Sequence, residues 1–313
     1  MKSKKTIVML SALAALCLTS CNNDDEVSVN DGKVRFTAGI GKEAVATPQS
    51  RAAGIEWHKG DEIGIFMVKH GTTTIAQDTE NRRYTTANGT NAFTPVMSHE
   101  IYYPMDNSAV DFIAYYPHSN GAQLATALPI EIALTQTDAT QRATDLMWAM
   151  ADNNAKGYTK DANKKVDFSF GHCLSKLTMN CTVDASVGAA SLLDAATVTI
   201  KGMNTVNTFD LRTATLGTTP TTVADIAPRR LDDAKDGFDG TYDAIILPGT
   251  YADGLLTVEF TINGETFVWD VKAIEFNPGH DYIYKVKITR TGVTATGTIT
   301  PWTPVERNEV TAE

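Results

Sequence analysis

Short runs in which apolar and polar residues alternate dominate this chain and constrain its fold more than any other feature. One such run is "KVRFTAGI", residues 33–40, in which Val34, Phe36, Ala38 and Ile40 would share one face of a strand. These runs are rich in β-branched and aromatic residues and are bounded by Gly, Pro, Asn and Asp, which is typical of half-buried antiparallel strands. Helical periodicity is scarce. The sequence therefore predicts an all-β fold.

The clearest β-hairpin lies in "LLTVEFTINGETFVWDV", residues 255–271. Its Asn263-Gly264 dipeptide tolerates the positive φ angles of a type I′ turn. Counting outward from the turn predicts three apolar pairs on one face: Phe260 with Phe267, Val258 with Trp269 and Leu256 with Val271. The opposite face would receive polar pairs, Thr261 with Thr266 and Thr257 with Asp270. One face of the hairpin should therefore belong to a core.

The alternation is lost between about residues 118 and 165, where two polar, loop-like stretches occur. Between them, "TQTDATQRATDLMWAMA" could hold a short helix, although its threonines and its isolated apolar cluster fit an irregular segment or a short strand as well. A chain of this length has two domains as its natural prior. We therefore predict an N-terminal domain of residues 33–165 and a C-terminal domain of residues 166–313.

The first residues indicate export. Three lysines precede an apolar stretch, residues 7–18, that is shorter than the roughly 20 residues of a membrane-spanning helix, so we expect residues 1–20 to be a signal peptide. The sequence Leu18-Thr19-Ser20-Cys21 is similar to the lipobox of bacterial lipoproteins, which would make Cys21 the lipidated N-terminus. The alternative is a secretory signal with a cysteine near its cleavage site by chance. Residues 21–32 are polar and acidic and should form a tether.

The net charge argues against a nucleic acid partner, and the cysteine positions argue against a disulfide. The net charge is −10, and it becomes −13 without the three lysines of residues 1–20, so a nucleic acid partner is not expected. Only Cys173 and Cys181 remain in the mature chain. On one strand their sulfurs would lie roughly 26 Å apart, whereas a disulfide needs Cα atoms within about 7 Å. We expect two buried thiols on one strand face; a disulfide would require a turn between them.

The sequence offers no active site. The six histidines are scattered and none has the spacing of a metal ligand, and the nucleophile-elbow and phosphate-loop motifs do not occur, so we expect no catalytic residue, no metal and no cofactor. Acidic residues such as Asp61 and Glu62 are interpreted as solvated turn residues, although a pair of carboxylates facing each other across a cleft would suit a hydrolase. Four aromatic residues could stack on sugars but are expected to be packing residues: Trp57, Tyr115, Tyr116 and Trp302.

Nine short motifs follow one another from the first strand to the last tryptophan. They are "VRFTAGIG", "SRAAGIEWHKGDEIGIFM", "IYYP", "VDFIAYYP", "DLMWA", "VDFSFGHCLSKL", "ILPGT", "FNPGHDYIYKVKI" and "ITPWTP". In this order they resemble the fimbrillin family of Bacteroidetes lipoproteins, the major and minor subunits of surface fimbriae of the type V pilus class. The resemblance implies two tandem transthyretin-like antiparallel β-sandwich domains. The acidic run after Cys21 also resembles a signal for the outer face of the outer membrane, with a linker that carries no address as the alternative.

The resemblance also implies a mode of assembly. In polymerising members an arginine-specific protease cuts behind the first strand, and a strand of the next subunit fills the groove that the freed strand leaves. Arg51 matches the processing site, and residues 22–51 would be lost with the strand that carries Val34, Phe36, Ala38 and Ile40. The alternative is that Arg51 is an ordinary loop residue and the strand stays in place.

The C-terminus fits the polymerising pattern less well. After Trp302 only "TPVERNEVTAE" remains, and the preceding Val293, Ala295 and Ile299 make a modest donor strand. We therefore expect a structural subunit or an accessory or tip component of fimbriae, with other fimbrial subunits as partners and a role in adhesion. The alternative is a monomeric outer-membrane lipoprotein that binds glycans or host ligands through exposed tryptophans.

Overall fold

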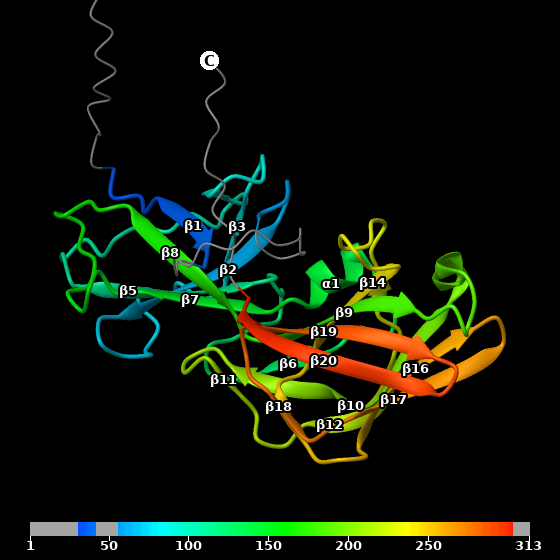
Figure 1. The fold of residues 1–313 in the computed structure, drawn as a ribbon. Coiled ribbons are helices and arrows are strands. Elements are labelled where there is room, and N and C mark those ends of the chain that lie inside the picture. The colour runs from blue at the N-terminus through cyan, green and yellow to red at the C-terminus, as the bar shows by residue number, and fades with distance from the viewer. Residues whose placement is uncertain (1–30, 42–55, 303–313) are drawn as a thin grey trace, which may run out of the picture. The chain divides into compact units, whose positions relative to one another are not determined.

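The computed structural model describes residues 31–41 and 56–302. Strands make up about half of these residues, and the regular helices among them are α1 (Asp138–Thr144) and one 3₁₀ helix (Ala190–Ala195) (Figure 1). The expected all-β fold is confirmed. Two of its strand pairs, β1 with β8 and β9 with β19, run parallel, so the sheets are mixed rather than wholly antiparallel.

The first sheet closes on itself. Its strands follow one another around the barrel as β1 (Phe36–Ile40), β4 (Ala92–Pro95), β3 (Arg82–Thr85), β2 (Glu62–Lys69), β5 (Val110–Tyr116), β7 (Met147–Ala151) and β8 (Val166–His172). One cluster of buried apolar side chains fills its interior. Closure leaves no unpaired sheet edge between the first and last strands, because β1 joins β4 to β8.

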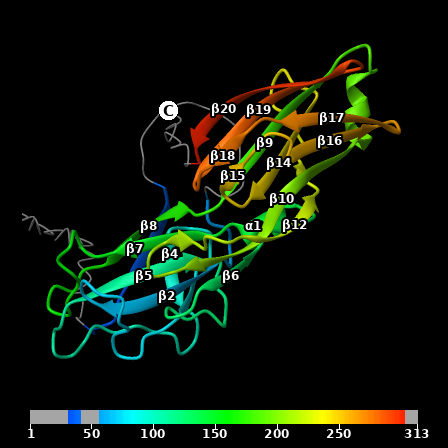
Figure 2. The same ribbon diagram turned by 90° about the horizontal axis from the view of Figure 1, so that it is seen from below.

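Two further sheets share a second core. The six-stranded sheet consists of β11 (Thr215–Leu216), β10 (Thr197–Asp210), β16 (Leu256–Ile262), β17 (Glu265–Val271), β12 (Thr221–Ile226) and β6 (Leu128–Glu131). The five-stranded sheet consists of β13 (Arg229–Arg230), β14 (Gly240–Ile246), β9 (Ser175–Val183), β19 (His280–Thr289) and β20 (Gly292–Pro301), and Figure 2 shows β19 beside β9. A small ribbon pairs β15 (Gly249–Tyr251) with β18 (Ile274–Phe276). Side chains of both large sheets belong to one buried cluster, as in a β-sandwich.

The hairpin of β16 and β17 has the predicted register. Phe260 lies opposite Phe267, Val258 opposite Trp269 and Leu256 opposite Val271, and these six side chains are buried. Thr261 lies opposite Thr266 and Thr257 opposite Asp270, on the other face. Asn263 and Gly264 both have positive φ, as a two-residue type I′ turn requires.

The strands before and after residue 165, where we predicted a domain boundary, do not separate into different sheets. β8 begins at Val166 and completes the first sheet, whereas the earlier β6 pairs with β10 in the second assembly. The non-alternating stretch holds both alternatives considered for it, since α1 is followed directly by β7. Thr137 caps α1 by accepting a hydrogen bond from the backbone of Thr140.

The two cysteines do not share one strand. β8 ends at His172 and β9 begins at Ser175, so Cys173 lies in the break between them, where its N–H donates to Leu146 O at 2.8 Å. Both thiols are free and buried, as expected. Burial raises the pKa of both thiols, to about 12 for Cys181.

Candidate functional site

Strand β1 is the element on which the expected assembly mechanism depends, and backbone hydrogen bonds hold it on both sides. Residues 36–40 pair in parallel with residues 166–170 of β8. On the other side only Phe36 and Thr37 pair with β4, opposite Phe93 and Ala92, and Ala38 N donates to Asn91 O at 2.8 Å. Removing β1 would therefore expose one edge of β8 and one edge of β4.

The apolar face of β1, continued by Val34 just before the strand, points into the barrel. Val34, Phe36, Ala38 and Ile40 are all buried, and each is at most 7% exposed. This is the face that the alternation predicted. We call the space that these four side chains fill, between β4 and β8, the β1 slot.

Phe36 packs among three aromatic rings in the β1 slot. Its ring centroid lies 5.0 Å from that of Tyr84 and 5.3 Å from that of Phe112, both edge to face. It stacks on Phe168 of β8 at 5.6 Å. Such aromatic pairs each contribute roughly 0.5–1.5 kcal/mol beyond the burial of their area. The slot therefore discriminates in favour of an aromatic side chain at this position.

Trp57 covers the other half of the slot. Its indole Nε1–H donates to Ala38 O at 2.6 Å, and its ring packs edge to face against Phe93, Tyr116 and Phe170, with centroids 5.0–5.4 Å away. Because Trp57 follows Arg51 in sequence, a cut after Arg51 would leave Trp57 in the body of the protein. The hydrogen bond from Trp57 to Ala38 O therefore joins a residue that follows the predicted cleavage site to one that precedes it.

A tight turn fixes Trp57 at the end of the slot. His58 N donates to Asp61 Oδ2 at 2.7 Å, and Gly60 adopts a φ of 87°, which favours glycine. Tyr116 OH donates to Asp61 Oδ1 at 3.2 Å, and burial together with this carboxylate raises the pKa of Tyr116. Asp61 is therefore a turn residue, as expected, but it is half-buried rather than solvated, and Glu62 is the first residue of β2 rather than a turn residue.

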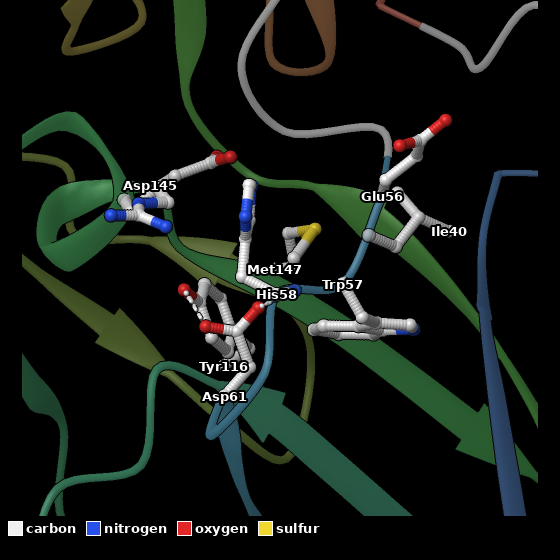
Figure 3. A pocket seen from close by; sticks show the side chains of 9 residues that line it. Ile40, Glu56, Trp57, His58, Asp61, Tyr116, Asp145 and Met147 are labelled. Carbon is white, nitrogen blue, oxygen red and sulfur yellow. Dashed lines mark hydrogen bonds between the residues drawn. The ribbon is translucent and has the colours of Figure 1, made fainter. Parts of the chain in front are cut away.

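The pocket beside this turn is too small for a ligand. Figure 3 shows it bounded by Ile40 of β1, the Trp57–Asp61 turn, Tyr116, Asp145 and Met147. Its free volume of about 10 Å³ would hold a single water molecule. Trp57, Tyr115, Tyr116 and Trp302 are all buried, so they are packing residues, as expected, and not a platform for sugars.

Sequence reasoning did not anticipate how the end of the described chain is held. Trp302 N donates to Gly279 O at 2.7 Å, and the indole stacks on the imidazole of His172 with 3.9 Å between centroids. The Nζ atom of Lys176 lies 5.9 Å from the centroid of the Trp302 indole ring. His172 in turn contacts Asp145 Oδ1 through Nδ1 at 2.9 Å. The only signal in the sequence was the motif "ITPWTP" itself.

Two of the predicted site residues, Cys21 and Arg51, lie outside the described residues. Of the four residues of the predicted displaced strand, Phe36, Ala38 and Ile40 lie in β1 and Val34 lies just before it, and all four are buried. Within residues 31–41 and 56–302, no group of three or more His, Cys, Asp or Glu side chains is arranged to hold a metal ion. In the same ranges, no helix has the length and apolarity needed to cross a membrane.

Known proteins similar to this chain are fimbrial or adhesive by name. A family described as fimbrillin-like matches residues 50–302. A relative from Bacteroides uniformis, whose name proposes a fimbrium subunit, Fim1C, is 31% identical and covers 96% of this chain and 96% of its own. A crystal structure from Bacteroides uniformis, of a protein proposed to act in cell adhesion, is 28% identical and has a TM-score of 0.67 over 87% of this chain and 99% of that one. Another such structure, from Bacteroides ovatus, shares the fold with a TM-score of 0.68, 21% identity and coverage of 86% of this chain and 97% of its own.

Proposed function

Because this chain belongs to the fimbrillin-like family, we propose that it is a cell-surface subunit or accessory component of fimbriae that assembles by exchanging β1 for a strand of another subunit. The proposal includes lipidation at Cys21, attachment to the outer membrane, cleavage after Arg51 and a role in adhesion without catalysis. The observation that carries it is the construction of the β1 slot: one strand closes a barrel and fills its core, and the predicted cleavage site follows that strand.

A β1 slot that holds another strand would be more stable than an empty one. Burying a Val, Ile or Phe side chain stabilises by about 1.5–3 kcal/mol each, so loss of Val34, Phe36 and Ile40 would remove several kcal/mol. The edges of β4 and β8 would also lose their backbone partners. An incoming strand with alternating apolar residues would restore both contributions, which is the physical basis of β-strand addition.

The donor strand must match the shape of the slot. It needs an aliphatic residue, an aromatic one, a small one and another aliphatic one at alternate positions, as in Val34, Phe36, Ala38 and Ile40. In this chain β20 offers Val293, Ala295, Gly297 and Ile299 at the same spacing, which leaves the aromatic position underfilled. β20 is also paired with β19 along its whole length. These facts favour an accessory or terminal position over a bulk stalk subunit.

Substitution of Arg51 tests the proposal. Wild-type protein treated with an arginine-specific protease is expected to lose residues 21–51, with the lipid on Cys21, by intact-mass measurement and to form SDS-resistant ladders, alone or with other fimbrial subunits of the same cell. Arg51→Ala should block both results. Arg290→Ala is the matched control, because Arg290 lies in the exposed β19–β20 turn and its side chain is 56% exposed. Ladders from the Arg51→Ala variant, or none from the cleaved wild type, would contradict strand exchange.

A further inference from the structure

Strand β20 forms an open edge of the five-stranded sheet. β19 pairs with one edge of β20 along its whole length, and among the described residues no strand pairs with the other edge (Figure 1). None of the ten residues of β20 is buried, and Ile299 is 59% exposed. An exposed strand edge of this length is a template for pairing with another strand.

The sequence of β20 lacks the features that usually protect a sheet edge from such pairing, which are charged residues, proline, bulges and short length. Other edges of the two large sheets have them: β17 carries Glu265 and Asp270, β13 consists of Arg229 and Arg230 alone, and the pairing of β12 with β10 is interrupted by a register shift. β20, "GVTATGTITP", has no charged residue, and its one proline is its last residue. Its edge is therefore suited to pairing with another strand.

The backbone groups of alternate residues of β20 point away from β19. Trp302 N donates to Gly279 O at 2.7 Å, and Thr289 lies opposite Gly292 at the two-residue turn between the strands. Because successive residues of a strand direct their N–H and C=O groups to opposite edges, the even-numbered residues of β20 bond to β19. The residues that present both groups at the open edge are therefore Val293, Ala295, Gly297 and Ile299.

The sequence of β20 is complementary to itself in one antiparallel register. With Thr296 opposite Thr296 of a second copy, Val293 lies opposite Ile299 and Ala295 opposite Gly297, and the same pairs recur on the other side of the axis. All the residues with backbone groups at the open edge then face one another and exchange two hydrogen bonds in each pair. The exposed Ile299 side chain gains an aliphatic partner, and such cross-strand pairs stabilise a sheet.

Charge also favours a second copy at this edge. The chain has a net charge of −10, so two copies repel each other least where the surface carries no charge. On the other face of β20, Thr294 would lie opposite Thr298, and Thr–Thr pairs are favourable across strands. The nearest cation opposite the axis is Lys285, which pairs with Thr296. The Lys285 residues of two copies would be three strand spacings apart, ~14 Å, which exceeds the Debye length of about 10 Å at 0.1 M salt.

We propose that two copies of this chain pair through β20, antiparallel about a two-fold axis at Thr296, so that their five-stranded sheets become one continuous sheet. Both copies use the same surface, so the contact closes as a dimer. The inference goes beyond the strand exchange proposed above and does not rest on it, because the folded chain makes this contact with β1 in place.

Sedimentation equilibrium of residues 22–313 tests the dimer. The chain carries Arg51→Ala, so that strand exchange cannot contribute, and a monomer–dimer equilibrium is expected. Thr296→Lys places two like charges opposite each other at the axis and should raise the dissociation constant about tenfold. Val223→Lys is the matched control, because Val223 is 65% exposed in β12 and receives the same charge, and it should leave the constant unchanged. A monomer at every concentration, or equal effects of the two lysines, would overturn the proposal and leave the ladders predicted for the cleaved protein unaffected.

Cysteine cross-linking tests the register in the same chain, whose two native thiols are buried. At the axis the two Cα atoms of Thr296→Cys would lie about 4.5 Å apart, within the reach of a disulfide, so mild oxidation should give a covalent dimer on a non-reducing gel. The two copies of Thr294→Cys would be roughly 14 Å apart and should not cross-link alone, but should cross-link when mixed with Thr298→Cys. Equal cross-linking of Thr294→Cys and Thr296→Cys, each alone, would contradict this pairing.

Discussion

At the scale of single residues, Phe36 contributes most to the β1 slot. Its ring touches Tyr84, Phe112 and Phe168, and its side chain is 3% exposed. The alternation of residues 33–40 predicted that Phe36 is buried. It did not predict which rings surround it, because these rings belong to residues that are 48 to 132 positions further along the chain.

Truncating Phe36 should therefore be costly. Phe36→Ala in the uncleaved protein is expected to lower the free energy of unfolding by about 3–5 kcal/mol, because it removes a buried aromatic side chain and leaves a cavity. Denaturant titration measures this change. Ile299→Ala, at a side chain that is 59% exposed, is the control and should stay within about 0.5 kcal/mol of wild type. Similar small losses for both variants would show that β1 contributes little to the core.

At the scale of elements, local signals predicted some pairings and missed others. The β16–β17 register followed from the Asn263-Gly264 turn, because a two-residue loop fixes which residues face each other. The parallel pairing of β1 with β8 has no such signal, since alternation identifies a buried face but not a neighbouring strand. For the same reason the boundary near residue 165 did not coincide with the strand pairing. The four buried residues of the candidate site were predictable, whereas the closure of the barrel around them was not.

Trp57 offers a test of how firmly β1 is held. Trp57→Phe keeps an aromatic ring but removes the hydrogen bond to Ala38 O, which should lower the free energy of unfolding by about 1 kcal/mol and speed the loss of β1 after cleavage. Trp148→Phe is the matched control, because it removes the comparable bond from Nε1 to Leu211 O at 2.8 Å. Mass spectrometry of the bound and free N-terminal fragment gives the release rate. An equal release rate in the two variants would argue against a specific role for Trp57.

At the scale of the whole molecule, buried polar groups join the parts of the fold that periodicity could not connect. Asp243 of β14 accepts two hydrogen bonds from Arg229, at 2.9 and 2.6 Å, and one from Gln141 of α1, at 2.9 Å. Lys176 of β9 lies 3.1 Å from the same carboxylate. Although burial opposes ionisation, these two cations and the amide hold the pKa of Asp243 below its ordinary value. The network fastens α1, in the non-alternating stretch, to the five-stranded sheet.

Acid should weaken the folded protein through His118. Burial, together with the nearby charge of Arg83, lowers the pKa of His118 from 6.5 to about 4. Between these two values the unfolded chain binds a proton that the folded chain does not, so stability falls as the pH drops from 6.5 towards 4. Denaturant titrations at several pH values should show a shallower fall for His118→Gln than for wild type. His58→Gln, at an exposed turn, serves as the control, and equal slopes in all three proteins would exclude His118 as a cause.

The mixed pairing of β1 has a consequence for any fibre built from this protein. A replacement strand that repeats the hydrogen bonds of β1 must run parallel to β8 and antiparallel to β4. Every junction would then have one permitted orientation, so all copies along a filament would point the same way. Such a filament would be polar. The subunit at one end would always carry a β1 slot without a donor strand, so new subunits would add at that end.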